Sequence, residues 1–288
     1  MNKILIILTM MFFATVAQAK DKLYILNSAS AGGSFNAQMT AYADGLEPFY
    51  DITYVQGKGC AKATANIKKI TDNGYQVLYI WNGLRTADFR NGKNNLCTKH
   101  ATPTNFVNSV LKYAVFFTKK NGIDKEDIFK EVVKVGYNSS TNQAYLQALM
   151  AYHGVDWQLV RYENSKGVTL AVMNEEVDFG MINSAKSYWK DSDKLKALYT
   201  LNKKGENGIT PLASVSGFAG ADDGIADMFL LEGGDNKKMR KHIASILNNP
   251  DSKISKWYAK AKGYTQTIDM SIVDSIAITE KQIANWVK

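Results

Sequence analysis

The chain contains 288 residues, of which 45% are hydrophobic and 22% are charged, with only 4 prolines and 21 glycines. This composition excludes a disordered, collagen-like or low-complexity chain, and the length fits one large domain or two smaller ones. The 35 Lys and Arg residues outnumber the 27 Asp and Glu residues and give a net charge of +8. Because the basic residues are dispersed, we expect no nucleic-acid partner.

Residues 1–19 have the pattern of a cleaved secretory signal peptide. Lys3 supplies a positive charge, residues 4–16 are almost entirely apolar, and Ala17-Gln18-Ala19 is a small-x-small cleavage pattern. The apolar run is well short of the ~20 residues that a spanning helix needs. We therefore expect removal of this segment and release of the mature chain, free of a lipid anchor, outside the cytoplasm.

The chain has two cysteines, Cys60 and Cys97. In a compartment that permits disulfides they could form one bridge, but two separate small residues in a core would give the same sequence. The three histidines and the cysteines do not lie near one another at ligand spacing, so we expect neither a metal nor a cofactor.

Short apolar runs alternate with amphipathic stretches in the first part of the chain. Residues 23–26, 52–55 and 77–81 read as buried strands, while 35–46 and 61–70 have the spacing of helices with one apolar face. The order of strand, helix, strand, helix, strand predicts a parallel sheet covered by helices.

A second α/β unit is predicted from residue 132 onward. Its expected strands are 132–135, 157–160, 177–182 and 195–201, and its expected helices are 141–153, ended by Gly154, and 166–174. We expect the last third of the chain to be mostly helical. The run 113–118, Tyr-Ala-Val-Phe-Phe-Thr, is the predicted first crossing between the two units.

The turn after the first strand could bind an anion. Ser30, Ala31, Gly32 and Gly33 lie between the strand and the helix that follows, where unpaired backbone N–H groups and the helix dipole favour a carboxylate or phosphate. A tight turn without a ligand explains the two glycines equally well. The spacing differs from that of a dinucleotide-binding loop.

A similar polar turn opens a helix of the second unit. Ser139, Ser140 and Thr141 offer hydroxyls and backbone donors there, although ordinary capping by Ser140 or Thr141 is the alternative. Asn183 and Ser184 would add side-chain donors from the same edge of the sheet. Two opposed helix starts of this kind predict a cleft that closes on a small acid.

Sequence motifs for catalysis are absent: the chain has neither a G-x-S-x-G elbow nor an H-E-x-x-H pair. Binding without turnover is therefore favoured, and we expect no enzyme. The alternative is a secreted hydrolase that uses Ser139 or Ser140. It lacks an evident base, because His153 lies at the far end of the adjacent predicted helix.

Several short motifs occur in the order found in a known family. They include Ala31-Gly32-Gly33, Asn73-Gly74-Tyr75, Gly154-Val155-Asp156, the stretch from Val177-Asp178 to Asn183-Ser184, and Lys194 to Leu198. Over nearly the whole mature chain, this order resembles the tripartite tricarboxylate transporter receptors, also called Bug receptors.

The resemblance implies a type II Venus-flytrap fold with two α/β lobes and a ligand cleft between them. The expected first lobe comprises residues 20–115 and about 217–288, and the expected second lobe about 116–216. Ligand carboxylates would be held by backbone amides, hydroxyls and water. Trp81, Asn82 and Ser165 are further wall candidates, although Trp81 reads equally well as a core residue.

The chain departs from the family pattern at positions that bear on the ligand. Asn27-Ser28 stands where the family tends to have Pro, and Asn36 and Asn183 stand where Asp is common. An amide carries no negative charge to pair with a ligand ammonium, so these departures favour plain carboxylates over amino acids.

The sequence thus predicts a monomeric periplasmic receptor that captures a small di- or tricarboxylate-like acid and hands it to the membrane permease of a tripartite transporter. Two alternatives stay open at this point. One is the secreted hydrolase, and the other is a binding protein of an ATP-driven or a sodium-coupled TRAP-type transporter.

Overall fold

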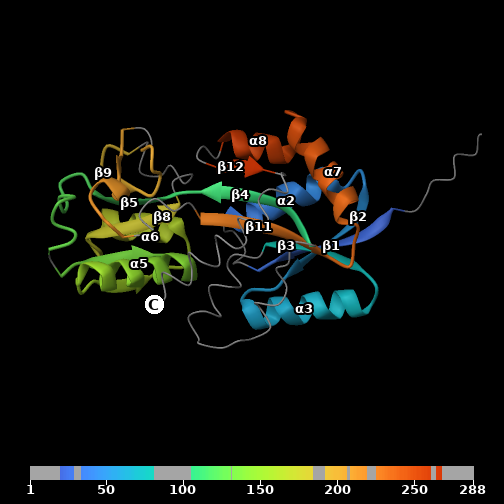
Figure 1. The fold of residues 1–288 in the computed structure, drawn as a ribbon, viewed down its shortest axis with the longest axis horizontal. Coiled ribbons are helices and arrows are strands. Elements are labelled where there is room, and N and C mark those ends of the chain that lie inside the picture. The colour runs from blue at the N-terminus through green and yellow to red at the C-terminus, as the bar shows by residue number, and fades with distance from the viewer. Residues whose placement is uncertain are drawn as a thin grey trace, which may run out of the picture.

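The computed structural model contains two α/β units, each built on a six-stranded sheet (Figure 1). We call them the first lobe and the second lobe in the order in which the chain enters them. The structure describes residues 20–28, 34–80, 105–130, 132–183, 192–205, 208–218, 225–260 and 264–267. The predicted signal peptide and Cys97 lie outside these residues, so cleavage and the disulfide stay predictions.

The first lobe combines the N-terminal elements with a C-terminal group. Its strand order is β12-β4-β11-β3-β1-β2, with β1 parallel to β2 and β3, and with β11 antiparallel to β3 and β4. Its elements are β1 (Asp21–Asn27), α2 (Ser34–Leu46), β2 (Tyr50–Gln56), α3 (Cys60–Asp72), β3 (Gln76–Ile80), β4 (Phe106–Lys112), β11 (Ile225–Glu232), α7 (Asn236–Asn248), α8 (Lys253–Lys260) and β12 (Tyr264–Thr267).

The second lobe is formed by the middle of the chain. Its strand order is β10-β9-β5-β8-β6-β7, in which β6 is parallel to β7 and β8, and β5 is antiparallel to β8 and β9. Its elements are β5 (Ala114–Lys119), β6 (Lys134–Tyr137), α5 (Ser140–His153), β7 (Gln158–Arg161), α6 (Ser165–Met173), β8 (Phe179–Asn183), β9 (Leu195–Thr200), β10 (Thr210–Pro211) and the 3-10 turn η3 (Leu212–Ser214).

The chain passes from the first sheet to the second through Tyr113, between the end of β4 and the start of β5. It has returned to the first sheet by Ile225, where β11 begins. Each lobe therefore contains an antiparallel strand inserted next to its parallel strands, β11 in the first and β5 in the second. The prediction of a mostly helical last third is wrong in this respect, because β11 lies inside the first sheet.

The strand predicted at 132–135 is also displaced. The structure places β6 at Lys134–Tyr137, and Val132 is 69% exposed. Val133 is nevertheless buried, so the pair of valines gave an apolar signal that begins before the backbone joins the ladder.

Helices cover both faces of each sheet (Figure 1). In the first lobe, α2, α7 and α8 pack on one face, where Tyr42 and Ile243 join the core, and α3 packs on the other face through Ile67. In the second lobe, Tyr145 of α5 and Val168 of α6 enter separate cores on opposite faces. Among the described helices, none is both long and apolar enough to cross a membrane.

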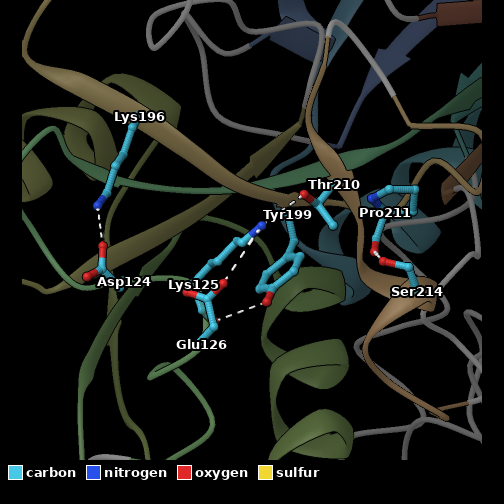
Figure 2. A network of polar contacts seen from close by, with 8 residues as sticks. All are labelled: Asp124, Lys125, Glu126, Lys196, Tyr199, Thr210, Pro211 and Ser214. Atoms are coloured by element: carbon cyan, nitrogen blue, oxygen red, sulfur yellow. Dashed lines mark hydrogen bonds and ion pairs between the residues drawn. The ribbon is translucent and has the colours of Figure 1, made fainter.

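The loop after β5 is held against β9 and β10 by polar contacts (Figure 2). Lys196 Nζ lies 2.9 Å from Asp124 Oδ1, and Tyr199 OH donates to the carbonyl oxygen of Lys125 over 3.1 Å. Lys125 Nζ donates to Thr210 Oγ1 over 3.4 Å. The ion pair is partly exposed and contributes about 1 kcal/mol or less, so this network serves to position the loop.

Candidate functional site

The carboxyl ends of the parallel strands in the two lobes lie toward the junction between the lobes. In the first lobe, Ile80 at the end of β3 is opposite Phe229, and β11 extends past this edge to its start at Ile225. In the second lobe, Asn183 at the end of β8 is opposite Ala114, where the chain has just arrived from β4. Ligands of open α/β sheets bind outside such carboxyl edges, which makes this junction the candidate site.

Uncharged polar side chains form a cluster at this edge of the first lobe. Asn27 and Gln56 end β1 and β2 and are opposite each other in the strand register. Asn27 Nδ2 donates to Gln56 Oε1 and to Asn36 Oδ1, both over 3.0 Å, and Tyr54 OH donates to Asn36 Oδ1 over 2.8 Å. Burial raises the pKa of Tyr54, so its phenol stays protonated at neutral pH. We call these four residues the first-lobe amide cluster.

A corresponding group lies at the edge of the second lobe. Ser139 caps α5, because its Oγ accepts from the backbone N–H of Asn142 over 3.0 Å. Asn142 Nδ2 donates to Asn138 Oδ1 over 3.3 Å and to the carbonyl oxygen of Met181 over 3.2 Å. Asn138 Nδ2 donates in turn to Ser165 Oγ over 3.2 Å. The Ser165 hydroxyl accepts this bond and keeps its own hydrogen for donation. Asn138, Ser139, Asn142 and Ser165 form the second-lobe amide cluster.

The structure places the predicted site residues as follows. Ser139 and Ser165 are linked through Asn138 and Asn142, Ser140 begins α5, Thr141 is buried and Asn183 is half-buried at the end of β8. Prediction named Ser140 or Thr141 as the helix cap, whereas the extended backbone of Ser139 makes it the cap. The remaining predicted residues lie outside the described part of the chain: Ser30, Ala31, Gly32, Gly33, Trp81, Asn82 and Ser184.

Sequence reasoning did not select Gln56, Tyr54, Asn138 or Asn142 as site residues. A usable signal was present, because Asn27 and Gln56 are polar residues at the last positions of two adjacent parallel strands. The burial of Asn27 could not be predicted, since a polar residue at a strand end is usually solvated, as Gln56 is.

The two amide clusters consist of amides, hydroxyls and a phenol and contain no charged side chain. Arg161 ends β7 and Glu163 follows that strand, both exposed, while Asp227 is buried in β11. Neutral donors at helix starts can hold a carboxylate through hydrogen bonds without an ion pair. Among the described residues, no three His, Cys, Asp or Glu side chains gather as a group that could hold a metal ion.

The serine hydrolase alternative needs a base beside Ser139 or Ser140. His153 ends the 14-residue helix α5, and Ser139 caps its start, so the two are about 20 Å apart. His153 Nε2 instead lies 2.8 Å from Ser216 Oγ, which is buried and also accepts from the backbone N–H of Phe218. This pair holds the segment that leads toward β11 against the end of α5.

Acidification is expected to destabilise the fold through His153. Burial lowers the pKa of His153 below its ordinary value of 6.5, so the unfolded chain binds this proton more readily than the folded protein. The free energy of unfolding should therefore fall as the pH drops below about 6.5. Urea unfolding at about pH 7.5 and about pH 5.5 tests this. We expect a larger loss in the wild type than in His153→Gln, and equal losses would contradict the assignment.

Comparison with known proteins identifies the fold. Neither a protein-family model nor a curated protein sequence matches the chain. A TctC solute-binding protein from Polaromonas, solved without ligand, is 15% identical with a TM-score of 0.65, over 94% of this chain and 98% of that one. The chain has the two-lobe fold of a solute-binding protein.

Two further solved structures carry a ligand. MatC from Rhodopseudomonas palustris with bound malate is 13% identical with a TM-score of 0.66, over 93% of this chain and 99% of that one. Another R. palustris protein, solved with adipate, is 14% identical with a TM-score of 0.64, over 92% of this chain and 95% of that one. Because the alignments cover nearly all of this chain, the likeness extends over both lobes.

Proposed function

We propose that the chain is an extracytoplasmic solute-binding receptor for a small di- or tricarboxylate-like acid. The observation that carries the proposal is the pair of amide clusters, which place uncharged hydrogen-bond donors at two strand edges directed toward the same junction. The receptor closes on the acid and does no chemistry, since neither cluster contains a nucleophile beside a base.

The similar solved structures support this proposal. MatC holds malate and the second R. palustris protein holds adipate, and both ligands are dicarboxylates. By the same likeness we propose a receptor of the tripartite tricarboxylate type that acts as a monomer in the periplasm, after signal-peptide cleavage, and delivers its ligand to a membrane permease. Each lobe presents its own donors, so binding requires both lobes at once and favours closure.

Ligand-dependent stability tests the proposed function. A carboxylate that binds only the folded protein, at 100 times its dissociation constant, should raise the free energy of unfolding by about 2.7 kcal/mol. Thermal unfolding with malate, succinate, adipate and citrate measures this shift. A clear shift with a sugar or a metal ion, and none with any of the acids, would remove the carboxylate assignment.

Matched serine variants locate the site in the same experiment. Ser165→Ala removes a hydroxyl of the second-lobe amide cluster. It should lower the affinity for the acid by about tenfold, the effect of one lost hydrogen bond. Ser214→Ala is the control, because Ser214 ends η3 and its Oγ donates to the carbonyl oxygen of Pro211, the residue before η3 (Figure 2). Equal affinities of the two variants would place the ligand elsewhere.

A further inference from the structure

The second charge of a dicarboxylate needs a partner in the receptor, and the residue inferred for that role rests on the proposed function. We propose that Arg161, the last residue of β7, binds the second carboxylate of the ligand. Through this contact Arg161 selects dicarboxylates over acids that carry a single carboxylate.

The first step is the charge that enters the closed cleft. The two amide clusters consist of neutral groups, which can hold a carboxylate through hydrogen bonds. Closure removes water from the other carboxylate as well, and a charged group that loses its hydration is strongly destabilised unless it is paired. A positively charged side chain at the same edge of the sheet offsets this cost.

The strand register places Arg161 beside the second-lobe amide cluster. Arg161 is opposite Tyr137, the last residue of β6, and Asn138 of the cluster follows Tyr137 directly. Neighbouring strands are only about 4.8 Å apart, a distance that the long side chain of arginine can span. Leu159, two residues earlier on the same face of β7, packs in the core that α5 covers. Arg161 therefore lies on the α5 side of the sheet, at the edge where α5 begins with Ser140.

The guanidinium group of Arg161 is not neutralised within its lobe. Arg161 is exposed, and its side chain forms no ion pair or hydrogen bond with the part of the chain that the structure describes. Glu163, the nearest acid along the chain, is exposed as well and is not paired with it. A guanidinium keeps its charge, and its planar fork of N–H donors fits both oxygens of a carboxylate.

The first lobe offers an internal comparison. Strands β1 and β2 end at Asn27 and Gln56, which are opposite each other as Tyr137 and Arg161 are at the ends of β6 and β7. The side chains of Asn27 and Gln56 are hydrogen-bonded to each other over 3.0 Å, so the strand-end amide of β2 is used within its own lobe. The corresponding position of the second lobe holds a cation. The two lobes therefore offer different groups to the ligand.

Lys58 is the competing cation at the edge of the first lobe. It is exposed between β2 and α3, in a loop where the backbone N–H of Gly57 donates to the carbonyl oxygen of Asn27 over 2.8 Å. This loop leads to α3, which packs on the opposite face of the sheet from α2. A lysine ammonium is also a strongly hydrated point charge and cannot form the bidentate pair that arginine forms.

Calorimetric titration of two matched ligand pairs tests the inference. Succinate and succinamate differ by replacement of one carboxylate with a carboxamide of nearly the same size, and so do adipate and adipamate. The wild type should bind the dicarboxylate of at least one pair more than tenfold more tightly than the amide. Arg161→Gln should lower the affinity for that dicarboxylate by about 10- to 100-fold, the range for a hydrogen bond to a charged group. Its affinity for the amide should stay within threefold of the wild type.

Two further variants each remove one positive charge. Lys120→Gln is the matched control, because Lys120 is exposed after β5, at the edge of the second sheet that lies away from the junction. Lys58→Gln tests the competing cation. Neither should change the preference for the dicarboxylate, the ratio of the two affinities, by more than threefold. The unchanged affinity of Arg161→Gln for the amide shows at the same time that this variant is folded.

The outcomes separate this inference from the proposed function. Loss of the dicarboxylate preference in Arg161→Gln, with the preference kept in Lys120→Gln and Lys58→Gln, supports the role of Arg161. An unchanged preference in Arg161→Gln, an equal or larger loss in either other variant, or a wild type that does not distinguish acid from amide overturns that role alone. Failure of the wild type to bind any di- or tricarboxylate overturns the proposed function and this inference together.

Discussion

Phe116→Ala should lower the free energy of unfolding by about 3–5 kcal/mol. Phe116 is fully buried in β5, an inner strand of the second sheet, with its ring centroid 5.9 Å from that of Phe179 and 6.5 Å from that of Tyr145. Truncation removes these contacts and leaves a cavity that the packed sheet and α5 cannot fill. Chemical denaturation with both near- and far-UV signals measures the change.

Val132→Ala is the control for this prediction. Val132 is 69% exposed, so loss of its methyl groups should change stability by no more than about 0.5 kcal/mol. A Phe116→Ala effect as small as that of the control would mean that the core of the second lobe is not packed as the structure has it.

Gly180→Ala should destabilise the second lobe by overpacking, by about 1–3 kcal/mol. Gly180 lies in β8, and a Cβ atom there would come within 2.6 Å of Val168 Cγ1 and 2.9 Å of Phe117 Cε1. Both neighbours are buried, so neither can move aside without disturbing the packing of α6 or β5 on this face. Equilibrium unfolding of the purified variant gives the magnitude.

A second substitution tests whether the close approach is the cause. Val168→Ala removes the γ carbons that the added methyl would strike, so the two substitutions should couple. We expect Val168→Ala to cost less stability in the Gly180→Ala background than in the wild type, with a coupling above about 0.5 kcal/mol. Simple additivity would show that α6 does not approach Gly180 as closely as described.

Regular local patterns were sufficient to predict many elements. The helix predicted at 141–153 is α5, which ends where Gly154 adopts a left-handed φ of 66° and donates its N–H to the carbonyl oxygen of Met150. Glycine takes this conformation without steric penalty, so the end of the helix is encoded locally. The strand at 23–26 lies within β1 for a similar reason, because its apolar residues and flanking polar residues mark a buried strand.

Strands β4 and β11 were not predicted because their environment is set by distant segments. Met228 and Phe229 of β11 enter the cores on opposite faces of the first sheet. Both faces of the strand are therefore buried, and its sequence does not alternate between apolar and polar residues. Asn108 interrupts the apolar pattern of β4, yet it is fully buried and its Nδ2 group donates to Tyr42 OH over 2.6 Å. A buried amide is stable only with such a partner, and the partner comes from α2.

The sequence by itself determined that this protein has two α/β units and which polar residues follow their strands, because both properties arise from neighbouring residues. Only the tertiary structure decided how the amides are paired. Asn27, Gln56 and Asn36 belong to three different elements, and their hydrogen bonds exist because β1, β2 and α2 meet at one edge of the sheet. The pairing is not encoded locally, because an amide can bond to any donor or acceptor within reach, and only the fold brings particular groups within reach.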